Sequence, residues 1–243
     1  YFSEEFGSYT SVQKNVSLNL ALQGTMSSYN DARLAAFFDP SSNGNYTGAI
    51  SGTNFSVSAS DHGAGYWCRP AVRFNSPVYL ITVSEVEFFL AEYYAKKDPS
   101  KAEAHYKAAV DASFASAGVT GADAVYGSGA AYAWDASAYK EVIGVQKWVA
   151  LSGTNNFEAW CELRRLGYPA FSGQKGDDFY NVQSGDYDAT TYIPGTLYTP
   201  ITVNAILGAG KVLQRFPFAD SSSSRNENVP EYKGDGAPMF WVK

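Results

Sequence analysis

Between Ser84 and Gly167 the chain carries apolar residues at helical spacing. A first helix is predicted to begin with the capping box of Ser84 and Glu87, in which each side chain accepts a hydrogen bond from a free backbone amide. It ends before Pro99, because a residue that precedes proline disfavours helical torsion angles. Its apolar stripe, at i, i+3, i+4 and i+7, is predicted to be Val86, Phe89, Leu90 and Tyr93.

A second helix follows after a short Asp-Pro turn, so that the two form an αα-hairpin. Its predicted capping box is Ser100 with Glu103, and its predicted end is Gly118. The inner stripe of this helix is Ala102, Tyr106, Ala109 and Val110. The pair fits the tetratricopeptide pattern, with a connection one residue short, through Leu90, Ala91, Tyr94, Ala102, Tyr106 and Ala109.

A second helix pair is predicted between residues 135 and 167. Asp135 is the expected cap of its first helix, and Gly167 closes the second helix before Pro169. The apolar stripe of the first helix consists of Tyr139, Val142, Ile143, Gln146 and Val149. That of the second consists of Phe157, Trp160, Cys161 and Leu163.

The flanks of these helix pairs differ from them in composition. Residues 1–80 are rich in Ser, Gly, Asn and Tyr with one short helix expected over 27–38, and helical signals weaken again over 170–243. We therefore predict a mainly α fold in which tetratricopeptide-like helix pairs at 84–169 lie between loop-rich parts with minor short β-strands. The 243 residues are expected to form a single domain.

Charge and hydropathy exclude two classes of protein. Eighteen Lys and Arg against 24 Asp and Glu give a net charge of −6, without the basic surface that nucleic-acid binding needs. No apolar run reaches the roughly 18 residues of a membrane span. Because the chain begins at Tyr1 with no signal-peptide pattern, we expect it to be a piece of a longer protein.

Motifs for metals, cofactors and catalysis are missing or incomplete. Cys68 and Cys161 form no C-x-x-C pair, which excludes a thiolate zinc site, although one disulfide between them is possible. No G-x-S-x-G elbow occurs, and GAGK at 208–211 lacks the other residues of a phosphate loop. We predict no catalytic residue, no metal and no cofactor. A pair of carboxylates for glycoside hydrolysis stays open among 24 acidic residues.

The helical region resembles a known family. Residues 84–169 are similar to the C-terminal half of the SusD/RagB-like outer-membrane nutrient-binding lipoproteins. The first matched helix has the E-V-x-F-L-x-A-E pattern, through Glu85, Val86, Phe88, Leu90, Ala91 and Glu92. The Q-K-W, E-A-W and R-R-x-G-x-P elements match through Gln146, Lys147, Trp148, Glu158, Ala159, Trp160, Arg164, Arg165, Gly167 and Pro169. Asp31-Ala32-Arg33-Leu34 resembles the family's D-P-R-L, with alanine in place of proline.

The resemblance implies a SusD-like α/α fold and a cell-surface protein of the outer membrane, held by a lipid anchor absent from this segment. It also implies non-catalytic binding of oligosaccharide or polysaccharide for delivery to a SusC-like TonB-dependent transporter. The matched residues themselves are expected to be structural, with Trp148 and Trp160 packed between helices. Glu158, Arg164 and Arg165 are expected to tie the second pair to its neighbours by charge-assisted hydrogen bonds.

Candidate ligand-binding residues come from the composition of one loop and are not transferred from the family. Aromatic residues make up 16% of the chain, and the Gly/Ser/Asn-rich loop 40–70 contains four of them. Sugar rings present C–H faces to aromatic rings and polar edges to amides and hydroxyls. The predicted binding residues are Tyr46, Phe55, Tyr66 and Trp67. The alternative, that these side chains anchor the loop to the helices, stays open.

Two other functions are compatible with the sequence. A helical glycan-active hydrolase would use carboxylates that the sequence does not identify, and it would release products from oligosaccharides. A tetratricopeptide-type adaptor would bind a peptide on its concave face, independently of Tyr66 and Trp67 and of added glycan.

Overall fold

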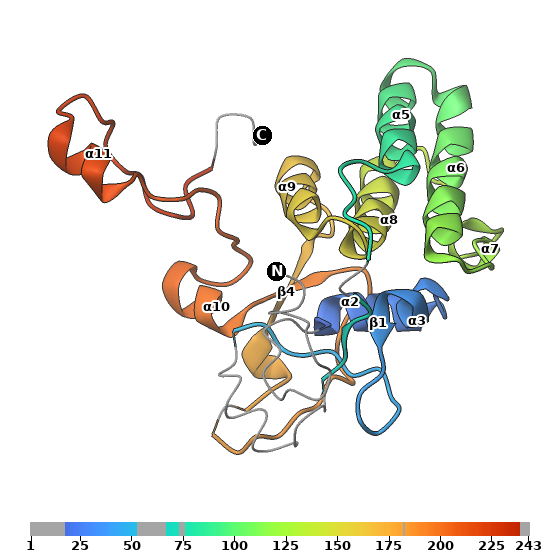
Figure 1. The fold of residues 1–243 in the computed structure, drawn as a ribbon, viewed down its shortest axis with the longest axis horizontal. Coiled ribbons are helices and arrows are strands. Elements are labelled where there is room, and N and C mark those ends of the chain that lie inside the picture. The colour runs from blue at the N-terminus through green and yellow to red at the C-terminus, as the bar shows by residue number, and fades with distance from the viewer. Residues whose placement is uncertain (1–17, 53–66, 73–75, 182, 239–243) are drawn as a thin grey trace.

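Helices make up most of the regular structure in the computed structural model, which describes residues 18–52, 67–72, 76–181 and 183–238. Four longer helices stand side by side at one end of the molecule (Figure 1). They are α5 (Val83–Lys97), α6 (Pro99–Ala117), α8 (Tyr139–Ser152) and α9 (Asn156–Leu166). Helix α5 packs against α6 and α8, and α8 packs against α9. The prediction of a mainly α fold with short strands is confirmed.

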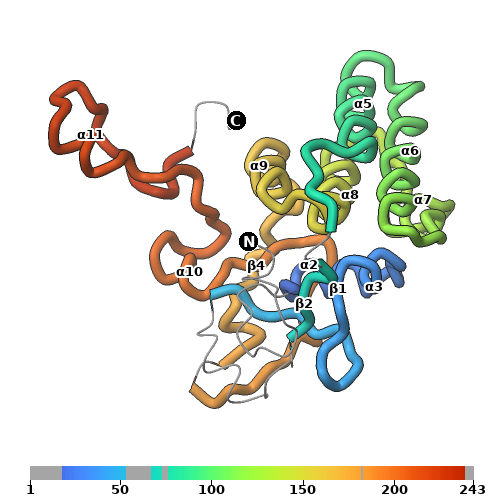
Figure 2. Tube along the Cα trace, in the orientation of Figure 1, coloured from blue at the N-terminus to red at the C-terminus, as the bar shows by residue number. Residues whose placement is uncertain are grey.

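Shorter elements lie below the four helices and beside them (Figure 2). Within the described residues the strands form two pairs: β1 (Phe38–Asp39) runs antiparallel to β2 (Arg69–Pro70), and β3 (Phe171–Lys175) runs parallel to β4 (Leu197–Thr199). The short helices are α2 (Leu20–Ser28), α3 (Arg33–Phe37), α7 (Asp123–Tyr126), α10 (Ile201–Leu207), α11 (Asp220–Arg225) and a 3₁₀ turn at Gly176–Asp178. The helix expected over 27–38 is realised only as α3, and α2 was not predicted. None of the described helices has the length and apolar character needed to cross a bilayer.

The start of α5 differs from the prediction. Thr82 caps this helix, since its hydroxyl accepts a hydrogen bond from the Glu85 amide at 3.1 Å. The Ser84 hydroxyl instead donates to the Ala109 carbonyl at 2.8 Å. The capping box of Ser84 with Glu87 is therefore wrong, and Ser84 ties α5 to α6.

Helices α6 and α8 also begin without their predicted side-chain caps. The Ser100 hydroxyl donates to the Asp98 carboxylate at 2.6 Å, and no side chain caps the α6 backbone, so the capping box with Glu103 is wrong. Helix α8 begins at Tyr139 rather than at Asp135. The Asp135 carboxylate lies in the preceding turn, where it accepts from the amide and hydroxyl of Ser137.

Parts of two predicted apolar stripes are exposed. On α5, Val86, Phe89 and Tyr93 are 41%, 42% and 55% exposed, and on α9 Phe157 is 63% exposed. The buried faces are Ser84, Glu85, Phe88, Ala91 and Glu92 on α5, and Ala159, Glu162 and Leu166 on α9. The stripe prediction is thus wrong for the four exposed residues, whereas the other predicted members are half-buried: Leu90, Trp160, Cys161 and Leu163. The fully buried faces of both helices carry carboxylates instead.

These carboxylates meet cations from the neighbouring helices. The Lys147 Nζ lies 2.9 Å from Glu162 Oε2, and the Arg165 Nη2 lies 2.6 Å from Glu92 Oε2 and 2.6 Å from Glu162 Oε2. Burial lowers the pKa of Lys147, although the Glu162 carboxylate acts in the opposite direction. Charge-assisted hydrogen bonds thus join α5, α8 and α9. The expectation that Arg165 ties the second pair to its neighbours is confirmed.

The predicted inner faces of α6 and α8 are confirmed. On α6, Ala102, Tyr106, Ala109 and Val110 are all 0% exposed. On α8, Val142, Ile143, Gln146 and Val149 are buried. The main core lies between α5, α6 and α8. Two further clusters surround α2, one with α3 and β1 and the other with residues of 179–198, and Trp148 packs against both.

The two cysteines are free thiols, so the possible disulfide does not form. Cys68 is buried within the cluster of α2, α3 and β1, and its thiol donates to the Asn45 carbonyl at 3.3 Å. Cys161, which was predicted to lie on the apolar stripe of its helix, is only partly buried. Its neighbour Trp160 is also partly exposed and contacts Phe216 from the C-terminal part of the chain, with ring centroids 6.4 Å apart.

Gly144 in α8 lies against the residue that follows α9. A Cβ atom at this position would lie 2.6 Å from the Tyr168 Cβ and 3.3 Å from its carbonyl oxygen. Helix propensity alone would make alanine more stable by about 1 kcal/mol. We instead expect Gly144→Ala to lower the free energy of unfolding by about 1–3 kcal/mol, measured by urea denaturation, because the buried contact cannot expand. Ala104→Gly, at an exposed position of α6, measures propensity alone. A gain in stability from Gly144→Ala would contradict the close contact.

Candidate functional site

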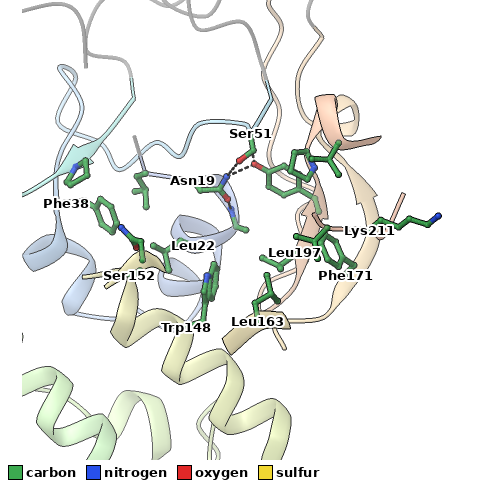
Figure 3. A pocket seen from close by; sticks show the side chains of 18 residues that line it. Asn19, Leu22, Phe38, Ser51, Trp148, Ser152, Leu163, Phe171, Leu197 and Lys211 are labelled. Carbon is green, nitrogen blue, oxygen red and sulfur yellow. Dashed lines mark hydrogen bonds between the residues drawn. The ribbon is translucent and has the colours of Figure 1, made fainter. Parts of the chain in front are cut away.

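A pocket of about 290 Å³ lies where α2 and the α8–α9 pair meet the C-terminal part of the chain. Its side chains come from segments far apart in the sequence (Figure 3). Most of them are apolar, including Leu22, Phe38, Trp148, Leu163, Phe171 and Leu197. The volume is near the lower limit of small-molecule sites, which span roughly 300–1,000 Å³.

Aromatic rings supply flat surface to this pocket. Phe38 comes from β1, Trp148 from α8 and Phe171 from β3 (Figure 3). Trp148 is held between the two clusters around α2, so its position is set by packing on both sides. Such a wall favours a molecule with an apolar face over a small ion.

The Asn19 side chain organises the polar side of the pocket. Its Oδ1 accepts from the Ala21 amide at 2.8 Å and so caps α2. Its Nδ2 donates to Ser51 Oγ at 2.5 Å and to the Tyr198 hydroxyl at 2.9 Å, the dashed lines of Figure 3. Burial raises the pKa of Tyr198, which keeps the phenol neutral. These groups fix the wall, and most of their hydrogen-bonding capacity is used within it.

Two further polar side chains of the pocket are exposed, Asn156 at the start of α9 and Lys211 after α10. The backbone before Lys211 is held because the Gly210 amide donates to the Thr199 hydroxyl at 2.7 Å. No residue in the described ranges forms an ion pair with Lys211. The Lys211 ammonium group and the Asn156 amide are therefore available to donate to a bound molecule.

The four predicted binding residues have different positions. Tyr46 is half-buried and packs against the cluster of α2, α3 and β1. Trp67 is 6% exposed, and its ring meets Tyr187 edge to face with centroids 5.4 Å apart, so little of its surface is free. Phe55 and Tyr66 lie outside the described residues. The binding role of this loop stays a prediction.

The loop nevertheless borders the pocket. Ser51, within the loop, lines it directly, and so do Phe38 and Pro70 at the two ends of the loop. Sequence reasoning missed the rest of this site. Lys211 was noted only as part of an incomplete phosphate loop, and Trp148 only as a packing residue. No local pattern marks Asn19, which acts mainly as a helix cap.

The part of the chain that the structure describes contains one histidine, His105. No group of three or more His, Cys, Asp or Glu side chains there is placed to hold a metal ion. His105 on α6 contacts Glu87, with Nδ1 2.7 Å from Oε2, and its ring stacks on Tyr94 with centroids 4.9 Å apart. His62 lies outside the described residues.

Comparison with protein families gives one match. A SusD-like family model, described as "Starch-binding associating with outer membrane", matches residues 8–184. No curated protein matches the chain.

Solved structures share the fold at low sequence identity. A SusD homolog from Bacteroides uniformis is 20% identical, with a TM-score of 0.66 over 100% of this chain and 53% of its own. A chitin-binding SusD homolog from Flavobacterium johnsoniae is 23% identical, with a TM-score of 0.65 over 93% of this chain and 49% of its own. The chain thus spans about half the length of these structures.

Proposed function

The chain belongs to the SusD-like family, and from that membership we propose that it binds carbohydrate at the surface of the outer membrane. In this proposal it breaks no bond and delivers oligosaccharide to a SusC-like TonB-dependent transporter. The observation that carries the proposal is the family match over residues 8–184, in a family described as starch-binding. The chitin-binding relative from Flavobacterium johnsoniae widens the expected ligands to other polysaccharides.

The pocket beside the 40–70 loop has the chemistry that a sugar requires. A pyranose ring has apolar C–H faces and a polar edge of hydroxyls, and it therefore needs flat apolar surface next to hydrogen-bonding groups. Trp148 and Phe171 supply the surface, and Asn156 and Lys211 supply the donors. Tyr46, Phe55, Tyr66 and Trp67 of the bordering loop would extend the contact along a longer chain.

A glycan array followed by calorimetric titration with maltoheptaose and chitohexaose tests the proposal. We expect binding without shortening of the oligosaccharide, which chromatography after incubation would verify. Shorter products that disappear when one carboxylate is substituted would contradict the non-catalytic role. Failure of every glycan to bind would contradict the proposed function as a whole. If the full-length protein is purified from outer membranes and no TonB-dependent barrel copurifies with it, the proposed partner is contradicted.

Substitution of Lys211 tests the pocket directly. We expect Lys211→Ala to weaken glycan binding roughly tenfold, since a charge-assisted hydrogen bond to the ligand is lost. The side chain is exposed, so the fold should remain intact. The matched control is Lys140→Ala, which removes an exposed lysine of α8 that does not line the pocket. Equal affinities of the two variants would show that the pocket is not part of the binding site. Unchanged binding by Tyr66→Ala would show the same for Tyr66 of the loop.

A further inference from the structure

The last described part of the chain forms an extended segment, residues 208–238, which we call the C-terminal strap. It leads from α10 to α11 at one side of the molecule and returns toward α9 (Figures 1 and 2). Its two arms are joined because the amides of Gln214 and Arg215 donate to the Asp235 carbonyl at 2.8 and 3.3 Å. Arg164 of α9 donates to the Gln214 carbonyl and so attaches the strap to the helix pairs.

A second cavity, of about 430 Å³, lies between α9 and this strap. Three aromatic side chains line it: Phe157 and Trp160 from α9, and Phe216 from the strap. The Trp160 ring centroid lies 5.8 Å from that of Phe157 and 6.4 Å from that of Phe216, with interplanar angles of 41° and 49°. Phe157 is 63% and Phe216 is 79% exposed. The Arg164 guanidinium lies over the Trp160 ring, 4.2 Å from its centroid, so Phe157 and Phe216 supply most of the exposed ring surface.

Charged groups of both signs lie beside these rings. Arg215 lines the cavity, and its guanidinium donates to the carbonyls of Ala237 and Pro238 at 3.1 and 2.9 Å, which fixes it in place. Asp235 also lines the cavity, and its Oδ1 accepts from the Tyr232 hydroxyl. Among the described residues no donor contacts its Oδ2, which leaves an acceptor for a ligand hydroxyl.

We propose that this cavity is a second carbohydrate contact, separate from the pocket of Figure 3. The inference rests on the proposed function and adds a site to it. Open aromatic faces bind the C–H face of a sugar ring, while a fixed carboxylate and a guanidinium bind hydroxyls at its edge. The presence of both charge signs fits a neutral ligand better than an anion or a cation. A long polysaccharide would contact both sites at once. It would bind more tightly than a short oligosaccharide, because contact with the second site becomes intramolecular once the first site is occupied.

Affinity electrophoresis in native gels that contain soluble starch or glycol chitin tests this site. We expect Phe216→Ala and Phe157→Ala each to weaken retardation of the protein roughly tenfold, as expected when an aromatic contact of a ligand is removed. Both side chains are largely exposed, so neither substitution should unfold the protein. The matched control is Phe218→Ala, an exposed phenylalanine of the same strap that does not line the cavity. The control should migrate like the unchanged protein.

The outcomes separate this inference from the proposed function. If Phe216→Ala and Phe157→Ala are retarded as strongly as the unchanged protein, the second site is refuted while carbohydrate binding stands. If the unchanged protein is retarded in neither gel, carbohydrate binding by the chain is contradicted and the second site with it. Equal weakening by Phe218→Ala would also refute the site, because the effect would then belong to the strap as a whole.

Discussion

Replacement of Arg33 by methionine is expected to lower the free energy of unfolding by about 3–5 kcal/mol. The side chains of Arg33 and Asp31 are both 0% exposed, and Nη2 lies 2.6 Å from Oδ2. The substitution would leave the Asp31 carboxylate buried without its cation. It would also remove donors to Gln146 Oε1 at 2.8 Å and to Ser113 Oγ at 3.0 Å. A buried charge that loses its partner keeps the full cost of desolvation, which explains the size of the effect.

Urea denaturation followed by circular dichroism measures this effect, and an exposed ion pair supplies the control. Lys107 pairs with Glu103 at 2.7 Å, but the two side chains are 40% and 49% exposed. Lys107→Met should therefore cost no more than about 1 kcal/mol. The double variant Asp31→Leu with Arg33→Met should recover part of the loss, because no buried charge then remains unpaired. Similar losses from Arg33→Met and Lys107→Met would mean that the buried pair has no special role.

The sequence marked Asp31 and Arg33 only through a family resemblance, without a role for either residue. Hydropathy places arginine on the surface, since charged residues are almost never fully buried unless they are paired. The charge partner Asp31 is only two positions away, but the pair is also held by Ser113 and Gln146, which are 80 and 113 positions from Arg33. Such pairing is decided by the packing of α3 against α6 and α8, which no local pattern encodes. The structural role expected for the matched motif residues nevertheless agrees with the buried position of Gln146.

Helix ends were predicted correctly where a single residue type determines them, and buried helix faces were predicted wrongly where they depend on side chains from other helices. Gly118 and Gly167 end α6 and α9 in the left-handed region, with φ of 70° and 78°, because glycine adopts this conformation without strain. The stripe of α5 was assigned to the wrong face because apolar periodicity alone assumes a core of apolar contacts. The true inner face carries Glu85 and Glu92, and Glu92 forms an ion pair with Arg165 of α9.

The candidate pocket was even less accessible to sequence reasoning. Its wall is built from residues as far apart as Asn19 and Lys211, each of which is unremarkable in its own segment. The aromatic content of the chain did indicate where flat binding surface is abundant, but not which rings are free. Trp67 is buried against Tyr187, whereas Phe216 in the strap is largely exposed. Exposure is a property of the whole fold, so composition alone does not distinguish these rings.

Acid is expected to destabilise the fold by about 3 kcal/mol through Glu92 alone as the pH falls from about 5 to about 2. Burial by itself would raise the pKa of Glu92, but hydrogen bonds from Arg165 and Lys96, together with their charges, lower it from 4.5 to about 2. A carboxyl whose pKa is lower in the folded than in the unfolded state adds stability above the unfolded pKa. That stability is lost as the pH falls toward the folded pKa. The pKa of Glu162 is lowered as well, so it adds to the loss, whereas the raised pKa of Glu85 opposes it.

Unfolding free energies measured from pH 7 to pH 2 for the unchanged protein and for Glu92→Gln isolate this contribution. The amide resembles the protonated carboxyl in shape but has no charge to pair with Arg165, whose Nη2 lies 2.6 Å from Glu92 Oε2. The variant should therefore be less stable at neutral pH, and the two curves should converge near pH 2. Glu103→Gln controls for the loss of one negative charge at an exposed pair, and its curve should follow that of the unchanged protein. Parallel curves for Glu92→Gln and the unchanged protein would show that the Glu92–Arg165 pair does not set the acid sensitivity of the helix pairs.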